Sequence, residues 1–188
     1  MAIKIYIDQG HNPVNPNAGS EGNGLREQDI VYRIGKELEA LLDADDDFDV
    51  RVSRPSEDTL LGTSNASSLR LRVEDANNWG ADYFLSLHTN ASVNTEASGS
   101  EAFVYSRNGE AYILSEIILS KLNAFTGLRN RGVKIRPSLY VLRRTRMPAA
   151  LIELGFITNY NDALLMSREP GLFAEAIYEA LLEYFGID

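Results

Sequence analysis

Cysteine is absent from this 188-residue chain, and its absence excludes several kinds of site at once. Without a thiol the chain can form no disulfide bond, no thiolate-bound zinc site and no cysteine nucleophile. The absence does not indicate a compartment, because exported bacterial proteins can also lack cysteine. Any metal centre must therefore be built from imidazole and oxygen ligands.

Positive charge is the second shortage. The chain has 18 lysine and arginine residues against 27 aspartate and glutamate residues, which gives a formal net charge of -9. Nucleic-acid binding requires a basic face that neutralises phosphates, so no nucleic-acid partner is expected. The same excess of acid disfavours charge-driven attachment to anionic polymers or membranes.

Long apolar runs are also missing. No stretch is long and apolar enough to span a membrane, so no membrane insertion is expected. The amino terminus leads directly into a predicted strand, from which we expect no signal peptide. The protein is then expected to be cytoplasmic, exported by another route, or a domain cut from a longer chain.

What the chain does contain is the composition of one ordinary globular domain. Its hydrophobic content of 44% and its charged content of 24% are close to globular averages. It has no internal repeat, no low-complexity linker, and enough residues for a substantial core. We therefore expect residues 1–188 to form a single domain, and we expect that domain to act as a monomer.

Only two histidines occur, and each follows a strand-like run. The run 3–7 is rich in β-branched isoleucine, and Gly10 ends it just before His11. The run 82–88 ends in His88. In open α/β sheets, ligands bind at the carboxyl ends of the strands. Two histidines placed in this way can converge on one metal ion.

Hydrophobic periodicity and turn residues divide the chain into interleaved strands and helices, which is typical of an α/β domain. Loops are predicted over 12–24 and 56–68, and a basic irregular stretch over 127–137. The predicted strands are 3–7, 48–52, 82–88, 101–105, 139–142 and 149–154. The predicted helices are 27–42, 69–79, 109–125, 159–166 and a final helix whose inner face is Phe173, Ile177, Leu181 and Phe185.

Two acids, Glu27 and Glu153, lie at positions where a carboxylate could take part in binding or catalysis. Glu27 opens the first helix, where an acid commonly does no more than interact favourably with the helix dipole. Alternatively, Glu27 is a metal ligand that closes the long loop back on His11. Glu153 interrupts the apolar run 149–154, and burying an acid is costly unless it is paired. A salt bridge, an exposed strand end, or a position facing the same site as the histidines would each explain it.

Several arginines lie near these residues in the sequence. Arg72 is expected on the surface of its helix, whereas Arg70 either lies on the surface or reaches the loop after Arg54. Arg143 and Arg144 are expected to be solvated, with bidentate pairing to a peptide carboxylate as the alternative.

The residue types available suit a catalytic zinc site. Such a site typically has three protein ligands from histidine and carboxylate, and water takes the fourth position. His11, Glu27 and His88 would supply that set. The bound water would ionise with a pKa of about 7, and a carboxylate outside the ligands must carry its proton to the leaving amine. Glu153 is the candidate for this general acid/base. No HExxH sequence is present, which excludes the common helical zinc-protease motif.

Several blocks of sequence, in their order along the chain, resemble the zinc-dependent N-acetylmuramoyl-L-alanine amidases of the type 3 (LytC-like) class. They cover nearly the whole chain, and together they are highly specific. The blocks are IDQGH at 7–11, RE at 26–27, Arg54, ADYFLSLHTNA at 81–91, GSE at 99–101, NRG at 130–132 and PAALIELGFITN at 148–159.

This resemblance implies a fold, a cofactor and a reaction. The implied fold is a mixed, twisted β-sheet of about six strands flanked by helices on both faces. The implied cofactor is zinc, held by His11, Glu27 and His88, with Glu153 as the catalytic acid/base. The implied reaction is hydrolysis of the amide between N-acetylmuramic acid and L-alanine in peptidoglycan.

The chain departs from the usual pattern of the family in two places. Gln9 stands where proline is common, and Asn12-Pro13 stands where glycine follows the first histidine. These changes alter the rigidity of the loop more than its ligands. We therefore expect them to affect substrate fit rather than metal binding.

Two other functions stay open at the level of sequence. One is a metal-binding or wall-binding domain that has lost catalysis, against which the presence of Glu153 argues. The other is a zinc peptidase that cuts the stem peptide instead of the sugar–peptide amide. The expected place of action is the bacterial cell wall. The expected role is that of an autolysin, a phage lysin, a mother-cell lysis enzyme or an excised catalytic domain.

Overall fold

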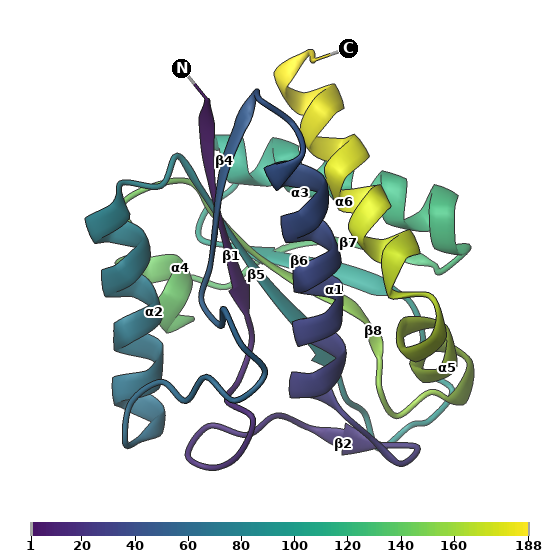
Figure 1. Ribbon diagram of the computed structural model, residues 1–188. Helices are drawn as coiled ribbons and strands as arrows, with labels where there is room; N and C mark the ends of the chain where they lie inside the picture. Colours follow the sequence, from purple (N-terminus) through teal and green to yellow (C-terminus); the bar gives the residue numbers. More distant parts are fainter. Residues whose placement is uncertain (1, 188) are drawn as a thin grey trace.

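One β-sheet organises the fold (Figure 1). The structure is a computed structural model that describes residues 2–187; Met1 and Asp188, the outermost residues of the expected domain, lie outside the described residues. The strands are β1 (Ile3–Gln9), β2 (Glu21–Gly22), β3 (Leu25–Arg26), β4 (Phe48–Val52), β5 (Tyr83–Asn90), β6 (Ser100–Val104), β7 (Asn130–Ile135) and β8 (Ala149–Phe156). The helices are α1 (Glu27–Asp43), α2 (Asn65–Trp79), α3 (Glu110–Thr126), α4 (Tyr140–Arg144), α5 (Tyr160–Arg168) and α6 (Pro170–Phe185).

The sheet is mixed, as expected. Its six strands lie in the order β4-β1-β5-β8-β6-β7, while the short strands β2 and β3 pair separately. Strands β4, β1, β5 and β8 are parallel, whereas β6 runs antiparallel to β8 and parallel to β7. The carboxyl ends of the four parallel strands therefore meet at one edge, which is the edge where ligands bind in such sheets.

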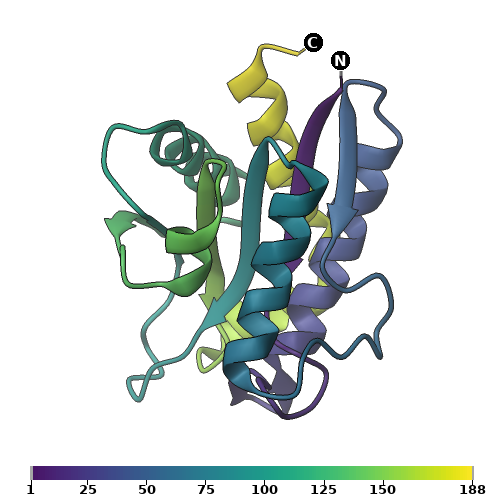
Figure 2. The same cartoon turned by 90° about the vertical axis from the view of Figure 1, so that its left-hand side faces the viewer.

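Helices cover both faces of the sheet, which confirms the expected architecture. Helices α1, α3 and α6 pack on one face, where their apolar residues join Ile5, Leu85 and Ile152 in the larger core. Helices α2 and α4 pack on the other face, where they join Phe84 and Leu151 in a smaller core. Figure 2 views the molecule from this second side, with α2 in front of the sheet and α4 beside it.

The alternation of strand residues decides on which face the two central site residues lie. Along β5, Phe84 belongs to the smaller core under α2, so His88, four residues later, points to the same face. Along β8, Leu151 belongs to that core, so Glu153 points to the same face as well. The strand register pairs His88 directly with Glu153. The two side chains therefore lie side by side on the face covered by α2.

One of the six predicted strands is wrong. Residues 139–142 contain the N-cap and the first residues of α4, with Val141 and Leu142 buried in the smaller core. Arg143 and Arg144 complete the helix and are exposed. A short apolar run has no periodicity by which a strand can be told from a buried helical turn.

The sixth strand is instead β7, inside the stretch 127–137 for which the sequence predicts irregular structure. It is an edge strand, and of its apolar residues Val133 packs against the larger core while Ile135 is exposed. Edge strands commonly carry charged residues that block further pairing. That charge conceals the alternation of β7 in the sequence.

Several element ends also differ from the sequence prediction. Strand β5 continues to Asn90, so His88 lies within the strand rather than at its end. Helix α2 begins at Asn65 rather than at residue 69, because Ser64 Oγ accepts the N–H of Ser67 in a capping box. Strand β8 continues to Phe156, so Glu153 lies within the strand rather than at its end.

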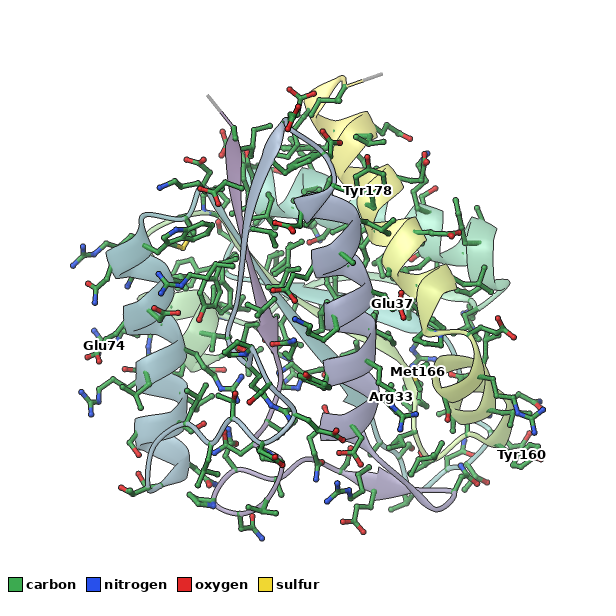
Figure 3. All side chains as sticks on the ribbon, in the orientation of Figure 1. Arg33, Glu37, Glu74, Tyr160, Met166 and Tyr178 are labelled. Atoms are coloured by element: carbon green, nitrogen blue, oxygen red, sulfur yellow. The ribbon has the colours of Figure 1, made fainter. Side chains whose placement is uncertain are left out.

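The outward sides of the helices carry polar residues. In Figure 3, Arg33 and Glu37 on α1 and Glu74 on α2 are exposed, whereas Met166 on α5 is buried in the larger core. Within residues 2–187, no helix has the length and the apolar character needed to cross a membrane.

Candidate active site

Three candidate ligands meet at the carboxyl edge of the sheet. His11 Nε2 lies 3.1 Å, and His88 Nδ1 3.0 Å, from the same oxygen, Oε1 of Glu27. One ligand atom from each residue lies within 4.8 Å of the other two. The Glu27 side chain is 4% exposed, while the two imidazoles are 21% and 19% exposed. The cluster is therefore anchored on a buried carboxylate and reachable from the histidine side.

Glu27 is held by hydrogen bonds on both of its oxygens. Oε2 accepts the Ser20 N–H at 2.9 Å and the Ser20 hydroxyl at 2.7 Å, and Oε1 accepts the Thr89 N–H at 3.0 Å. Burial alone would raise the pKa of Glu27, but hydrogen bonds from His11 and His88 outweigh burial and hold that pKa well below its usual range. The carboxylate is thus both ionised and fixed in orientation.

Two glycines make room for the three side chains. A Cβ at Gly10 would lie 2.6 Å from Cε1 of His88. A Cβ at Gly19 would lie 2.9 Å from Cβ of Glu27 and 3.0 Å from Cδ2 of His11. These separations are shorter than van der Waals contact, so any larger residue would force the ligands apart.

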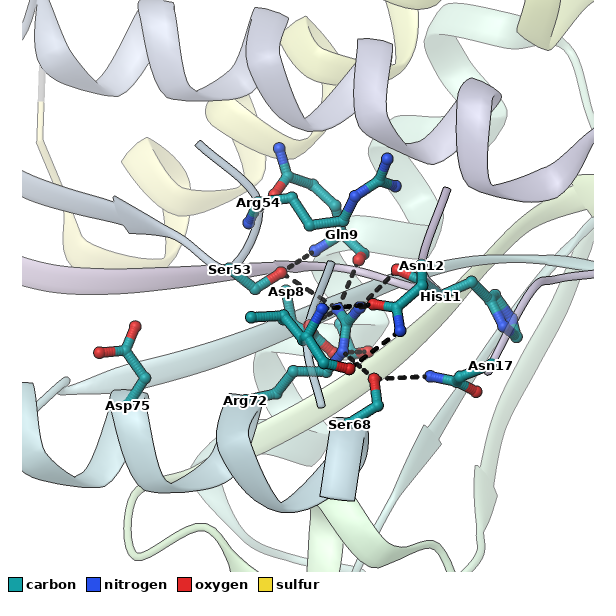
Figure 4. Close-up of polar contacts among 12 residues, drawn as sticks. Asp8, Gln9, His11, Asn12, Asn17, Ser53, Arg54, Ser68, Arg72 and Asp75 are labelled. Atoms are coloured by element: carbon teal, nitrogen blue, oxygen red, sulfur yellow. Dashed lines mark hydrogen bonds and ion pairs between the residues drawn. The ribbon is translucent and has the colours of Figure 1, made fainter. Parts of the chain in front are cut away.

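His11 itself adopts a left-handed backbone conformation, with a φ of 68°. This conformation costs a residue with a Cβ about 1–2 kcal/mol, so neighbouring contacts must hold it. Figure 4 shows the contacts: the Arg72 guanidinium donates to the carbonyl oxygens of His11 and Gln9 and pairs with the Asp8 carboxylate at 2.6 Å. Arg72 thereby fixes the main chain from which the His11 imidazole projects.

The prediction that Arg72 lies on the surface is wrong. Its side chain is 1% exposed, because position 72 lies one helical turn from the buried Ser68 and Ala76 on the inner face of α2. Asp8 compensates the charge and also accepts the Ser86 hydroxyl at 2.7 Å. Burial would raise the pKa of Asp8, but Arg72 and Ser86 hold it below its usual value.

Gln9 and Asn12, two of the residues that depart from the family pattern, brace the loop after β1. Gln9 Oε1 accepts the Arg54 N–H at 2.8 Å. Asn12 Nδ2 donates to the carbonyl oxygens of Pro16 and Leu61 at 2.7 and 2.9 Å, and its Oδ1 accepts the Leu61 N–H at 3.1 Å. Both residues therefore add hydrogen bonds around the cluster without removing a ligand. Their expected effect on substrate fit stays a prediction.

Arg54 ties the end of β4 to the start of α1. Its Nη1 donates to the Gln28 carbonyl at 2.9 Å and its Nη2 to the Glu57 carbonyl at 2.9 Å. The guanidinium also lies over the Tyr32 ring. Burial lowers the pKa of Arg54 to about 10, and the residue stays charged at neutral pH. It holds the first turn of α1, and with it Glu27.

Glu153 is the next acid along the sheet. The register pairs it with His88 on β5 and with Glu101 on β6. Its Oε2 is buried and has no hydrogen-bond partner within residues 2–187. Burial, together with the charges of Glu27 and Glu101, raises the pKa of Glu153 to about 8. The raised pKa favours the protonated form of Glu153 at neutral pH.

Glu101 behaves in the opposite way on the neighbouring strand. It pairs with Arg131 Nε at 3.0 Å and with Lys134, and it accepts from Asn90 Nδ2 at 2.9 Å. Burial would raise the pKa of Glu101, but Lys134 and Arg131 hold it below its usual value. Of these two paired acids, Glu153 is the one left free to exchange a proton.

The donor set at the cluster fits a divalent metal ion. Two imidazole nitrogens and a carboxylate oxygen are typical ligands of a zinc ion that keeps one open position. Tetrahedral ligands at the usual bond lengths lie about 3.3 Å apart. The separations around Glu27 Oε1, 3.0 and 3.1 Å, are close to that value. The group of His11, Glu27 and His88 can therefore hold a metal ion.

The other arginines singled out from the sequence, Arg70, Arg143 and Arg144, have no contact with this cluster. Arg70 is exposed and pairs with Glu74 at 3.3 Å. Arg143 and Arg144 are exposed on α4, as predicted. Arg143 lines a cavity at the opposite end of β8, where Ala149 begins the strand.

Sequence reasoning missed two polar clusters that surround the site. The sequence does contain a signal for the pair of Asp8 and Arg72, because a charged residue such as Asp8 beside an isoleucine-rich strand requires a buried partner. Glu101 and Arg131 stand in the blocks 99–101 and 130–132 that resemble the family, but no local pattern pairs them, because Arg131 and Lys134 belong to the stretch predicted as irregular.

Comparison with known proteins agrees with this geometry. The family model described as N-acetylmuramoyl-L-alanine amidase matches residues 5–183. The chain is 37% identical to the N-acetylmuramoyl-L-alanine amidase CwlM of Bacillus licheniformis over 163 residues, which are 86% of this chain and 59% of that protein. It is 35% identical to the N-acetylmuramoyl-L-alanine amidase LytC of Bacillus subtilis (strain 168) over 185 residues, which are 96% of this chain. The chain spans 59% of the length of CwlM and 35% of the length of LytC.

A solved structure shares the whole fold. The crystal structure of N-acetylmuramoyl-L-alanine amidase from Clostridium difficile 630 matches with a TM-score of 0.87 at 30% sequence identity. The match covers 98% of this chain and 97% of that one. The mixed sheet and its flanking helices are thus the architecture of that protein as well.

The buried pair yields a prediction about stability. Arg72→Met leaves Asp8 buried without its partner, and it should lower the free energy of unfolding by about 3–5 kcal/mol in urea denaturation. Arg70→Met on the same helix is the matched control, because it breaks only an exposed pair, and it should cost less than about 0.5 kcal/mol. The double variant Asp8→Asn/Arg72→Met should recover part of the loss. Equal stabilities of the two arginine variants would contradict the role given to Arg72.

The raised pKa of Glu153 yields a prediction about pH. Between its ordinary pKa and about 8, the folded state binds the proton of Glu153 more tightly than the unfolded state does. Stability therefore falls as the pH rises through this range. Relative to Glu153→Gln, the metal-free wild type should lose about 1–3 kcal/mol between pH 5 and pH 8. Glu74→Gln, at an exposed acid, should follow the wild type. Parallel stability curves for wild type and Glu153→Gln would show that Glu153 titrates normally.

Proposed function

This chain belongs to the family of N-acetylmuramoyl-L-alanine amidases, and on that premise we propose that residues 1–188 form a zinc-dependent catalytic domain. The substrate is peptidoglycan, and the bond cleaved is the amide between N-acetylmuramic acid and the L-alanine of the stem peptide. The domain acts on the bacterial cell wall, as part of an autolysin or an endolysin. The observation that carries the proposal is the convergence of His11, Glu27 and His88 beside Glu153.

The three converging side chains would hold the zinc ion. Each histidine nitrogen lies 3.0 to 3.1 Å from Glu27 Oε1, near the ligand separation of a tetrahedral site, and hydrogen bonds from Ser20 and Thr89 keep Glu27 in place. When bound, zinc supplies a Lewis acid that activates water and polarises the amide carbonyl at neutral pH. The two partly exposed imidazoles leave that position open to a substrate.

Glu153 would carry the proton. It lies beside His88 but outside the converging group, and its Oε2 has no competing hydrogen bond within the described residues. A general base takes a proton from the attacking water and then gives it to the leaving nitrogen. The pKa of about 8 would fall toward neutrality once a cation offsets the charge of Glu27. A carboxyl with a pKa near neutrality suits both halves of that transfer.

Product analysis tests the proposal against its alternatives. With defined muropeptides as substrate, an amidase releases a stem peptide that begins with a free L-alanine amine. A zinc peptidase acting on the stem releases shorter peptides and leaves L-alanine attached to the sugar. A wall-binding relative without catalysis releases neither product. Only the first outcome supports the proposed reaction.

Metal binding should require His88. The wild type should retain about one zinc per chain after dialysis, measured by mass spectrometry of the intact protein. His88→Ala leaves two ligands and should lose zinc and activity together, whereas Glu74→Ala, an exposed acid on α2, should keep both. A strong chelator should abolish activity and added zinc should restore it. Wild-type stoichiometry in His88→Ala would refute the ligand assignment.

The two acids should fail in different ways. Glu27→Ala removes a ligand, so zinc content and activity should fall together. Glu153→Gln preserves size and hydrogen bonding but cannot accept a proton, so its zinc content should stay near that of the wild type. Its rate should fall by about 10²–10⁴, the usual contribution of a general acid/base. The measurement is zinc content and muropeptide cleavage for both variants in parallel. Loss of zinc from Glu153→Gln, or nearly full activity in it, would be incompatible with the role proposed for Glu153.

A further inference from the structure

A cavity of about 340 Å³ opens beside Glu153 on the face of the sheet covered by α2. Glu101 and Phe103 of β6 and Leu151 of β8 line it, together with Arg136, the residue that follows β7. None of the three candidate metal ligands lines this cavity. His11 and His88 line a separate, smaller cavity of about 140 Å³. The acid/base and the metal ligands therefore face two neighbouring spaces.

This division indicates on which side of the site the stem peptide lies, an inference that rests on the proposed amidase function. The group that protonates the leaving nitrogen has to stand on the side of the leaving group. Glu153 lines the larger cavity, while His11 and His88 line the smaller one. The amine product of the reaction is the stem peptide. The peptide therefore runs from Glu153 into the larger cavity.

The charges on the wall of this cavity indicate which chemical group of the peptide it can bind. Arg131, at 3.0 Å, and Lys134 both pair with Glu101, so both of these cations are already engaged with a carboxylate. Arg136 is different: it is exposed, and within residues 2–187 its guanidinium has no ion-pair or hydrogen-bond partner. It lies over the Phe103 ring with a separation of 5.1 Å from the ring centroid. Its charge is therefore available to an anion in the cavity.

The backbone holds Arg136 in place. Its N–H donates to the Val104 carbonyl at 2.9 Å, and its own carbonyl accepts the Leu139 N–H at 3.2 Å. The side chain thus projects from a fixed turn and rests on an aromatic ring. A guanidinium that is ordered before binding loses less entropy when it pairs with a carboxylate.

The size of the cavity limits which carboxylate can be reached, and the second stem residue lies within that limit. A cavity of this volume is about 9 Å across, a distance that an extended peptide covers in two to three residues. The stem begins with L-alanine at the scissile bond, and its second residue is D-glutamate joined through its side-chain carboxyl. The α-carboxyl of that residue is a free carboxylate in some walls and an amide in others.

We propose that Arg136 binds the free α-carboxylate of the second stem residue in this cavity and makes the enzyme prefer unamidated stems. Arg136 is a specificity-determining residue in this assignment, because it touches the substrate away from the reacting atoms. A guanidinium pairs with a carboxylate through two parallel hydrogen bonds, which an amide cannot accept in the same way. Loss of Arg136 should therefore act mainly on KM.

A matched pair of substrates tests this assignment. Two disaccharide tetrapeptides are compared, identical except for D-glutamate or D-isoglutamine at the second position, and kcat/KM is measured with the zinc-loaded protein. The wild type should cleave the acid form about tenfold better than the amide form, the effect of one partly exposed charged pair. Arg136→Gln should lose that factor on the acid form and stay within about twofold of the wild type on the amide form. Arg136→Lys should retain part of the preference.

Arg107→Gln is the matched control. Arg107 is also exposed and also lies over an aromatic ring, that of Tyr112 at 5.9 Å, but it follows β6 and lines neither of the two cavities. Its variant should keep the wild-type preference. Zinc content and circular dichroism should be unchanged in all variants, because neither arginine is buried.

Each remaining outcome overturns a specific statement. If the wild type cleaves both substrates equally, or if Arg136→Gln lowers kcat/KM for both substrates to the same extent, Arg136 does not bind the carboxylate. The amidase function then still stands. If the wild type releases no stem peptide with an L-alanine amine from either form, the proposed function fails first, and the role of Arg136 falls with it.

Discussion

The buried ion pair between Asp8 and Arg72 is the contact on which the candidate site depends. Both side chains are 2% exposed or less, so neither charge could be buried without the other. Such a pair contributes little to stability compared with well-packed apolar residues, but it joins the end of β1 to the inner face of α2 at 2.6 Å. The end of β1, with the left-handed backbone of His11, is held by that contact. The pair therefore helps to position His11, a candidate metal ligand.

The register of the sheet supplies the second constraint. His88, Glu153 and Glu101 form a row across β5, β8 and β6, because the register pairs each with the next. Adjacent strands lie about 4.8 Å apart, so a charge in this row acts strongly on its neighbours. Lys134 and Arg131 stabilise the ionised form of Glu101, and that charge in turn helps to keep Glu153 protonated. One row of residues thus contains two carboxyl groups in different states.

The sequence could predict those parts of the fold whose pattern is local. The apolar runs 3–7, 82–88 and 149–154 are strands, and the meeting of His11 with His88 follows because parallel strands end at one edge. Short or charged segments could not be assigned in this way, since 139–142 is too short to show a period and β7 is an edge strand rich in charge. The burial of Arg72 depends on Asp8, which lies 64 residues away in the chain and can be matched to it only in three dimensions.

The two acids at the centre of the site show why one carboxylate could not serve both proposed purposes. Glu27 accepts hydrogen bonds on both oxygens, which holds it in the single orientation that a metal ligand requires. Glu153 leaves Oε2 without a partner in the described structure, and a group that passes a proton between two positions requires such a free oxygen. Their charges are also compensated differently: imidazoles face Glu27, whereas a proton neutralises Glu153. In a chain with a net charge of -9, the site thus holds one ionised and one protonated acid, and Arg136 places a positive charge on the wall of the cavity beside Glu153.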